Sequence, residues 1–193
     1  MSTTAVSTRP GGTGPELVVL LDERGQPIGT SEKVSVHGPD TPLHLAFSCH
    51  LSNEAGELLV TRRSLGKRTW PGVWTNSFCG HPAPGESLTA AMERRGVQEL
   101  GVRVRNARLI LPDFRYRAVD ASGVVENELC PVFRAVTSDP VRLDPAEAVE
   151  YRWVSEAALR RAVRDAPWAF SPWLTLQLPL LAASAAAAEN GAV

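Results

Sequence analysis

A cysteine and a histidine stand two residues apart in a stretch rich in turn-forming residues. The stretch is WTNSFCGHPAPGES, residues 74–87, and it places Cys79 and His81 among two glycines and two prolines. Packing alone gives a turn little reason to contain either side chain, because turns run over the surface. The pair could bind a metal ion, act as a nucleophile with its base, or have no chemical role.

Two glutamates alternate in the segment VVENELC, residues 124–130. If this segment is a strand, Glu126 and Glu128 point to the same face of the sheet. Neighbouring carboxylates repel one another unless their face is solvated or holds a cation. A solvated face is the simpler interpretation of this pair taken alone.

Histidines could provide the cation site that such a pair needs. The chain has four of them, His37, His44, His50 and His81. Imidazoles and carboxylates are suitable ligands for Mn²⁺, Mg²⁺ or Zn²⁺. The spacing matches no local zinc signature, so spacing alone supports the site weakly. His50, at the far end of its strand, is expected to be exposed or to act as a cap.

The segment GHPAPGESLTAAMERRGVQELGV, residues 80–102, partly matches the Nudix box. Residues that fit are Gly80, Glu86, Arg94, Glu99, Gly101 and Val102, whereas Arg95, Gly96 and Gln98 do not. Acids of this box bind Mg²⁺ ions that neutralise a diphosphate and activate water. Because two acids are replaced, Glu99 could hold one Mg²⁺ on a diphosphate but is poorly equipped to drive hydrolysis. An exposed helix of mixed charge would explain the charged residues but not the loop at 80–86.

Basic and aromatic residues are concentrated in TRRSLGKRTWPGVWTN, residues 61–76. The cations are Arg62, Arg63, Lys67 and Arg68, beside Trp70 and Trp74. Arg63 and Lys67 could clamp a phosphate. A charged, solvated hairpin edge explains the segment equally well in isolation. Nucleic-acid binding is disfavoured, because the net charge is −1 and no extended basic stripe is present.

The composition predicts a single-domain cytoplasmic protein. The 193 residues, 44% of them hydrophobic, suffice for one well-buried core. Three cysteines argue against a disulfide framework and favour a reducing compartment. No apolar run reaches the roughly 18–20 residues of a membrane span. The first sixteen residues lack the features of a secretory signal.

Hydrophobic patterning predicts the elements that must position these residues. Strands are expected within 16–29, in a hairpin at 43–64, and within 106–119 and 124–137, and helices at 87–101, 155–166 and 171–188. Ser87 is the expected N-cap of the first helix and Gly101 its stop. This order predicts an α+β fold with a mixed sheet. Residues 1–15 are expected to form a disordered tail, 16–180 the domain, and 181–193 an alanine-rich tail.

Together these segments resemble one family, the type 1 isopentenyl-diphosphate isomerases, a divergent group of Nudix-fold enzymes. The resemblance covers most of the chain, from about residue 17 to residue 175. It rests on TPLHLAFS, LLVTRR, WPGVWTNSFCGHP, PDFRYRA, ENELCPVF and WAFSPW. It implies a mixed β-sheet sandwiched between α-helices, with an additional N-terminal strand. The family isomerises rather than hydrolyses, which agrees with the missing acids of the box.

The resemblance implies an enzyme that interconverts isopentenyl and dimethylallyl diphosphate. Protonation of the alkene gives a tertiary carbocation, and a second group removes a different proton. By the family's pattern these groups are Cys79 and Glu128. Tyr116 corresponds to the tyrosine that hydrogen-bonds the catalytic carboxylate, and Trp173 could stabilise the cation.

The resemblance also implies two metal ions and a set of substrate contacts. One divalent ion, Mn²⁺ or else Zn²⁺ or Mg²⁺, would lie at His37, His44, His81, Glu126 and Glu128. A Mg²⁺ ion would bridge Glu99 and the diphosphate. Expected diphosphate contacts are Lys33, Arg63, Lys67 and Arg95. The implied partner is a small-molecule diphosphate, without nucleic acid or membrane, for a monomer or weak homodimer.

Two other functions make different demands on the sequence. A Nudix hydrolase predicts acids at positions 95 and 98, where the chain has Arg95 and Gln98. A catalytically inactive Nudix module that binds a diphosphate or a partner predicts loss of the pair Cys79 and Glu128, yet both are present.

Overall fold

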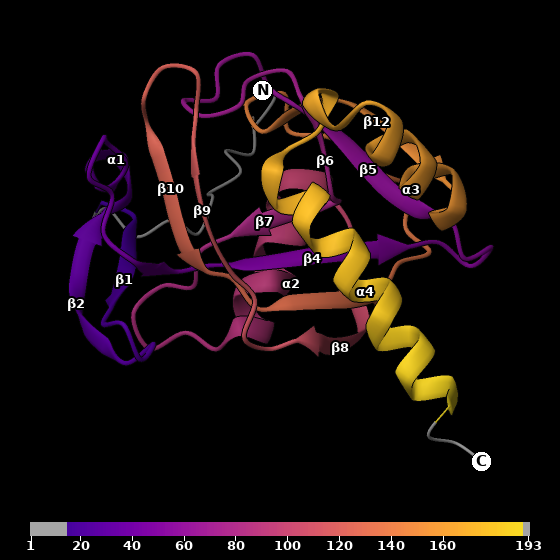
Figure 1. The fold of residues 1–193 in the computed structure, drawn as a ribbon, viewed down its shortest axis with the longest axis horizontal. Helices are drawn as coiled ribbons and strands as arrows, with labels where there is room; N and C mark the ends of the chain where they lie inside the picture. Colours follow the sequence, from indigo (N-terminus) through magenta and orange to yellow (C-terminus); the bar gives the residue numbers. More distant parts are fainter. Residues whose placement is uncertain (1–14, 191–193) are drawn as a thin grey trace, which may run out of the picture.

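Two mixed β-sheets form the framework of the chain, of which the computed structural model describes residues 15–190 (Figure 1). The five-stranded sheet has the order β2 (Pro27–Glu32), β1 (Leu17–Leu21), β3 (His44–Leu45), β10 (Val125–Leu129) and β9 (Arg115–Val119). The seven-stranded sheet has the order β12 (Ala148–Val154), β5 (Leu58–Arg63), β4 (Phe47–Ser52), β11 (Val132–Val136) and β8 (Arg105–Leu111), with β6 (Trp74–Thr75) on β5 and β7 (Phe78–Gly80) on β4. The predicted N-terminal strand is β1, and the polar segment after it turns back to form β2, which pairs antiparallel with β1.

The two sheets are continuous along one parallel ladder. Strand β3 leads into β4, and strand β10 leads into β11. Strand β3 pairs with β10 and β4 pairs with β11, both in parallel. Where the strands are interrupted, Ala46 N donates to Leu129 O (2.9 Å) and Ser48 N to Pro131 O (3.0 Å). The segment that carries β3 and β4 and the segment that carries β10 and β11 therefore run side by side through both sheets, in a fixed register.

Helices cover both faces of the seven-stranded sheet, as predicted. On one face, Phe47, Cys49 and Leu51 share a buried core with Met92 and Leu100 of α2 (Leu88–Leu100). In Figure 1, α2 lies behind β4 and α4 (Pro172–Asn190) in front of it. The remaining helices are α1 (Lys33–Val36), α3 (Glu156–Asp165) and a 3₁₀ turn at Pro167–Ala169. No helix of the described residues is long and apolar enough to cross a membrane.

His50 is buried, contrary to the prediction that it is exposed or caps a strand. It alternates with Cys49 and Leu51 and so faces α4 rather than α2. Its side chain is 2% exposed, and its Nε2 atom lies 2.9 Å from Oε1 of Gln177 on α4. The sequence pattern missed this position because a polar residue facing a second helix looks the same as one facing solvent.

The helix ends follow the sequence closely, and α4 matches the helix expected at 171–188. Ser87 Oγ accepts a hydrogen bond from Ala90 N, and Gly101 adopts the left-handed conformation at φ 66°. Helix α4 continues through Pro179, and Leu181 is 1% exposed, so the expected boundary at residue 180 falls inside a helix. Residues 1–14 and 191–193 of the two expected tails lie outside the described residues.

The predicted hairpin at 43–64 opens almost at once. Strands β4 and β5 pair only at Ser52 and Leu58, and then separate to admit β6 and β7. Ser77 joins the separated strands, because its Oγ accepts from Leu51 N (2.7 Å) and donates to Leu59 O (2.8 Å). Residues 74–80 are therefore a wedge held inside the sheet, and not a surface turn.

Gly96 has a packing role that explains the departure from the Nudix box. A Cβ atom at this position would lie 2.6 Å from Cγ2 of Val104 and 3.6 Å from Phe78 Cζ. Any side chain here would force α2 away from the segment that follows it. We expect Gly96→Ala to destabilise the protein by about 1–2 kcal/mol, because overpacking outweighs the gain of about 1 kcal/mol in helix propensity.

Urea unfolding of Gly96→Ala, Val104→Ala and the double variant measures this effect. Removing the Val104 methyl groups should relieve the clash, so the double variant should be more stable than the sum of the single effects predicts. Additive effects, or a stabilised Gly96→Ala variant, would contradict the assignment.

Candidate active site

Strand register places three site residues in one row across the five-stranded sheet. His44 on β3 is paired with Glu128 on β10, and Glu128 is paired with Tyr116 on β9. His44 Nε2 lies 3.5 Å from Glu128 Oε1, and the Tyr116 hydroxyl donates to Glu128 Oε2 at 2.9 Å. Glu126 lies two residues before Glu128 and points to the same face.

Two further histidines close over this row from outside the sheet. His37 follows α1, and its Nε2 lies 2.9 Å from Glu126 Oε2. His81 follows β7, and its Nε2 lies 3.2 Å from Glu128 Oε1. Ligand atoms of His37, His44, His81 and Glu128 all lie within 4.8 Å of one another. The expected ligands therefore come together from four separate segments.

The donor set fits a divalent ion. His37 Nε2, His44 Nε2, His81 Nδ1 and Glu126 Oε2 are buried, and none of them makes a well-aligned hydrogen bond among the described residues, although His37 and His44 approach the glutamates to 2.9 and 3.5 Å. Buried polar atoms without a partner are costly, so such a group points to a missing ligand. Glu126 Oε1, in contrast, accepts from the Thr69 hydroxyl at 2.7 Å, which orients the carboxylate toward the histidines.

The histidines determine the charge state of Glu128. Burial opposes ionisation, but hydrogen bonds and charge from His44 and His81 outweigh it and lower the pKa of Glu128 well below its usual value. For His81, burial is the dominant cause and lowers its pKa. For His44, the contacts with Glu128 outweigh burial and raise its pKa.

A cavity of about 450 Å³ lies beside this cluster. Its walls include all of the predicted site residues except His44, which is fully buried beneath it. The predicted residues in the wall are Lys33, His37, Arg63, Lys67, Cys79, His81, Arg95, Glu99, Tyr116, Glu126, Glu128 and Trp173. The structure thus brings the candidate metal ligands, the basic residues and the predicted acid/base pair, Cys79 and Glu128, to one cavity.

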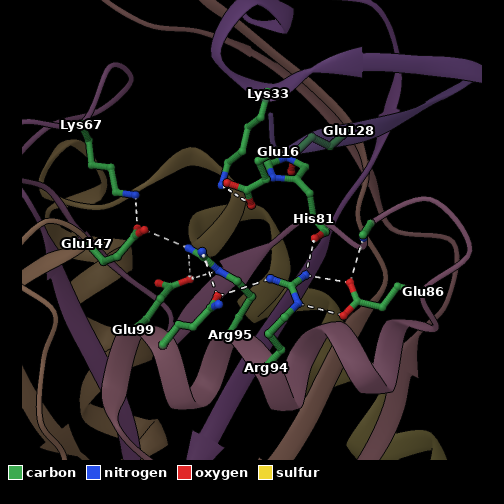
Figure 2. Close-up of polar contacts among 12 residues, drawn as sticks. Glu16, Lys33, Lys67, His81, Glu86, Arg94, Arg95, Glu99, Glu128 and Glu147 are labelled. Carbon is green, nitrogen blue, oxygen red and sulfur yellow. Dashed lines mark hydrogen bonds and ion pairs between the residues drawn. The ribbon is translucent and has the colours of Figure 1, made fainter. Parts of the chain in front are cut away.

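Three basic residues of the cavity, Lys33, Lys67 and Arg95, are paired with acids, and two of these acids, Glu16 and Glu147, could not be selected from the sequence. Glu147 accepts from Lys67 and, at 3.0 Å, from Arg95 Nη2 (Figure 2). Arg95 also donates from Nε to Glu99 Oε1 at 2.8 Å. Burial opposes the ionisation of Glu147, but Lys67 and Arg95 lower its pKa to about 2. Glu16 similarly binds Lys33 at 3.0 Å.

Arg63 differs from the other predicted phosphate contacts because it binds backbone oxygens. Its Nε donates to Trp70 O (3.1 Å) and its Nη2 to Thr69 O (2.9 Å). Its guanidinium lies 5.0 Å from the ring centroid of Trp173. Trp70, in the left-handed region at φ 42°, packs edge-on against Trp173 at 5.7 Å. Arg63 therefore supports the loop and the indole beside the cavity.

Cys79 sits in a polar socket made by two buried side chains. Ser48, opposite Cys79 in the β4–β7 pairing, places its Oγ 3.1 Å from Cys79 Sγ. Asn76 places its Nδ2 3.3 Å and its Oδ1 3.4 Å from the same sulfur. Burial raises the pKa of the Cys79 thiol to about 12, although these two contacts lower it. The thiol therefore keeps its proton at neutral pH.

Asn76 links Cys79 to Trp173 and was missed from the sequence. Its Nδ2 donates to Cys49 O (3.0 Å) and Phe78 O (2.8 Å), so its Oδ1 must face the other way. That oxygen accepts from Trp173 Nε1 at 2.9 Å. Asn76 is fully buried, although it lies in a segment predicted to be a turn. Burial is what distinguishes this asparagine, and only the structure shows it.

The surviving Nudix-box residues hold the loop that carries His81. Glu86 binds Arg94 through both oxygens (2.8 and 2.7 Å) and accepts from Ala83 N at 2.8 Å. Arg94 also donates to His81 O at 3.2 Å (Figure 2). These bonds fix the loop from Gly80 to Glu86 to α2. The interpretation of α2 as an exposed helix of mixed charge did not explain this loop.

Comparisons with known proteins agree with this architecture. The NUDIX domain model matches residues 42–174. Among solved structures, one from Deinococcus radiodurans has a TM-score of 0.66 at 19% identity, covering 85% of this chain and 98% of its own. A MutT protein from Methanosarcina mazei has a TM-score of 0.59 at 22% identity, covering 74% and 93%. At these identities the structures establish the fold.

Curated relatives establish the family. An isopentenyl-diphosphate Delta-isomerase from Clavibacter sepedonicus is 62% identical over 92% of this chain and 96% of its own length. The relative of the same name from Leifsonia xyli is 58% identical over 91% and 96%, and that from Citrobacter koseri 55% identical over 84% and 90%. At this identity over almost the whole of both proteins, the chain belongs to the isopentenyl-diphosphate Delta-isomerase family.

Proposed function

We propose that this chain is an enzyme that interconverts isopentenyl and dimethylallyl diphosphate. The observation that carries the proposal is a neutral thiol, Cys79, and an ionised carboxylate, Glu128, in the wall of one cavity that also contains a cluster of basic residues. A double-bond shift needs one group that gives a proton and one that takes a different proton. The family membership names the substrate that fits this arrangement.

The two groups are held in complementary protonation states. The Cys79 thiol has a proton to give, and the Glu128 carboxylate can accept one. Burial, with the charge of Glu128, raises the pKa of Tyr116 well above its usual value. Tyr116 therefore stays protonated and holds Glu128 Oε2 through a hydrogen bond of 2.9 Å.

The cavity suits a tertiary carbocation between the two proton transfers. Trp173 is 3% exposed and its ring lies in the cavity wall, 5.8 Å from the ring of Tyr116. An indole face stabilises a cation without the nucleophilic oxygen of water, which would quench it. The hydrogen bond from Trp173 Nε1 to Asn76 fixes the orientation of this face.

The opposite end of the proposed substrate is a diphosphate. Lys33, Lys67 and Arg95 lie at the cavity and are neutralised by Glu16, Glu147 and Glu99. Lys33 and Lys67 are half-buried and Arg95 is buried, and the acids keep all three charged and available to phosphate oxygens. Glu99 would hold a Mg²⁺ ion, which supplies positive charge to the diphosphate.

His37, His44, His81, Glu126 and Glu128 would hold the second divalent ion, for which Mn²⁺, Zn²⁺ and Mg²⁺ are the candidates. The ion supplies a fixed positive charge beside Glu128 and tunes the protonation of its carboxyl. We place the enzyme in the cytoplasm, in keeping with the free thiols of Cys49, Cys79 and Cys130. One chain contains every site residue, so a monomer or weak homodimer without nucleic acid or membrane suffices.

We expect Glu128→Gln and Cys79→Ala each to lower kcat by about 100-fold to 10,000-fold, because each removes a general acid or base. The KM should stay within a few-fold, since neither group binds the diphosphate. The assay supplies isopentenyl diphosphate with Mg²⁺ and follows both dimethylallyl product and released phosphate.

Cys49→Ala is the matched control, because Cys49 is buried on the opposite face of β4 against α2. Phosphate release without isomer would instead favour a hydrolase. If neither product forms, the result would favour a binding module. Full activity of Cys79→Ala would refute its assignment.

We expect His81→Ala to weaken binding of Mn²⁺ to the metal-free protein by at least about 100-fold, because loss of a ligand should exceed the effect of an outer-shell change. Calorimetry and the electron paramagnetic resonance signal of free Mn²⁺ measure this without turnover. His50→Phe, which changes the one histidine outside the cluster, should bind Mn²⁺ as the unmodified protein does. Equal affinity of His81→Ala would contradict the ligand set.

A further inference from the structure

A chain of buried side chains leads from the α4 side of the sheet to the sulfur of Cys79. His50 Nε2 lies 2.9 Å from Gln177 Oε1, and Gln177 Nε2 lies 2.9 Å from Ser48 Oγ. Ser48 Oγ lies 3.1 Å from Cys79 Sγ. Ser48, His50 and Gln177 are buried and absent from the cavity wall, so they cannot contact the substrate there.

The direction of these hydrogen bonds is fixed at the His50 end. Burial lowers the pKa of His50 to about 4, so the ring is neutral and has a single N–H. Within the described part of the chain, Nε2 is the ring nitrogen that has a hydrogen-bond partner. Because the atom that faces it is Gln177 Oε1, which can only accept, the proton sits on Nε2, and the amide nitrogen of Gln177 faces Ser48.

The Ser48 hydroxyl consequently has one proton to donate and one acceptor within reach, Cys79 Sγ. Its Oγ accepts from Gln177 Nε2 and from Cys130 Sγ at 3.5 Å, which occupies both oxygen lone pairs. The hydroxyl proton then points to Cys79 Sγ. Because the sulfur accepts this bond, its own proton is turned away from Ser48. Asn76 Oδ1, 3.4 Å from the sulfur, already accepts from Trp173 Nε1 (2.9 Å) and from the Thr75 hydroxyl (2.9 Å), so the thiol proton is left to face the cavity that Cys79 lines.

We propose that Ser48 is a positioning residue for the Cys79 thiol, and that His50 sets the direction of its hydrogen bond through Gln177. Ser48 holds the sulfur so that its proton faces the substrate. The same hydroxyl remains a donor to the sulfur while the proton is transferred. The inference rests on the proposed isomerase function, which gives Cys79 its role.

Steady-state kinetics of Ser48→Ala test the first part. We expect kcat to fall about tenfold, the value of one lost hydrogen bond, with KM unchanged within about twofold. Ser52→Ala is the matched control, because Ser52 lies on the same face of β4 and loses a bond to Ala135 O (3.2 Å) far from the thiol. Wild-type kcat in Ser48→Ala would overturn the proposal.

The direction of the chain is tested from its remote end. In His50→Phe the Gln177 amide is free to turn over, and its Oε1 would then accept the Ser48 proton and remove the donor from Cys79. We expect a lower kcat even though His50 does not line the cavity. His50→Phe/Gln177→Met removes the competing acceptor and should recover kcat. A double variant as slow as His50→Phe would overturn the directional chain, and this pair decides the question if Ser48→Ala fails to fold.

Infrared spectroscopy gives a readout that does not need turnover. The S–H stretching band of Cys79 is assigned by its loss in Cys79→Ala. We expect the band to shift in Ser48→Ala and in His50→Phe, and to return in the double variant. An unshifted band would refute the hydrogen bond, whereas absence of isomerase activity in the unmodified protein would refute the proposed function alone.

Discussion

The cost of burying a charge at Glu128 is the constraint on which the rest of the structure depends. An isolated carboxylate in this position would be strongly destabilising, and would take up a proton instead. His44 and His81 at one oxygen and the Tyr116 hydroxyl at the other keep it ionised. Two of these partners lie on the adjacent strands β3 and β9, so the strand register is itself part of the electrostatic balance. A shift by one residue would turn these side chains to the other face of the sheet.

The same principle governs the basic end of the cavity. Lys67 and Arg95 come from different elements and would repel one another if nothing lay between them. Glu147 supplies the opposite charge. Its backbone joins the segments that carry the two cations, because Glu147 O accepts from Ser64 N, and Glu147 N donates to Asp144 O, whose residue in turn donates from its N to Glu99 O. The cations are held ready rather than left mobile, which reduces the entropy lost when an anion binds.

Local chemistry made part of this arrangement predictable. Ser87 and Gly101 delimit α2 because caps depend on a few neighbouring residues, and Glu126 and Glu128 share a face because strands alternate. Glu147, Gln177 and Asn76 could not be selected, because each takes its meaning from partners far along the chain or from burial. His50 was misplaced for the same reason. The grouping of the histidines came from the family resemblance and not from their spacing.

Position 95 shows how one fold can support different chemistry. The Nudix box places a metal-binding acid there, and Arg95 reverses the charge at the same point of the helix. Glu99 and Glu147 are then ion-pair partners of the arginine, since both accept hydrogen bonds from Arg95. Burial raises the pKa of Glu99, with Glu147 adding to this and Arg95 opposing it. A helix face that would otherwise gather cations to activate water instead carries a cation of its own, which in the proposed function faces the diphosphate. Under the proposed function, the thiol, carboxylate and indole in the rest of the cavity then act on the hydrocarbon end of the substrate.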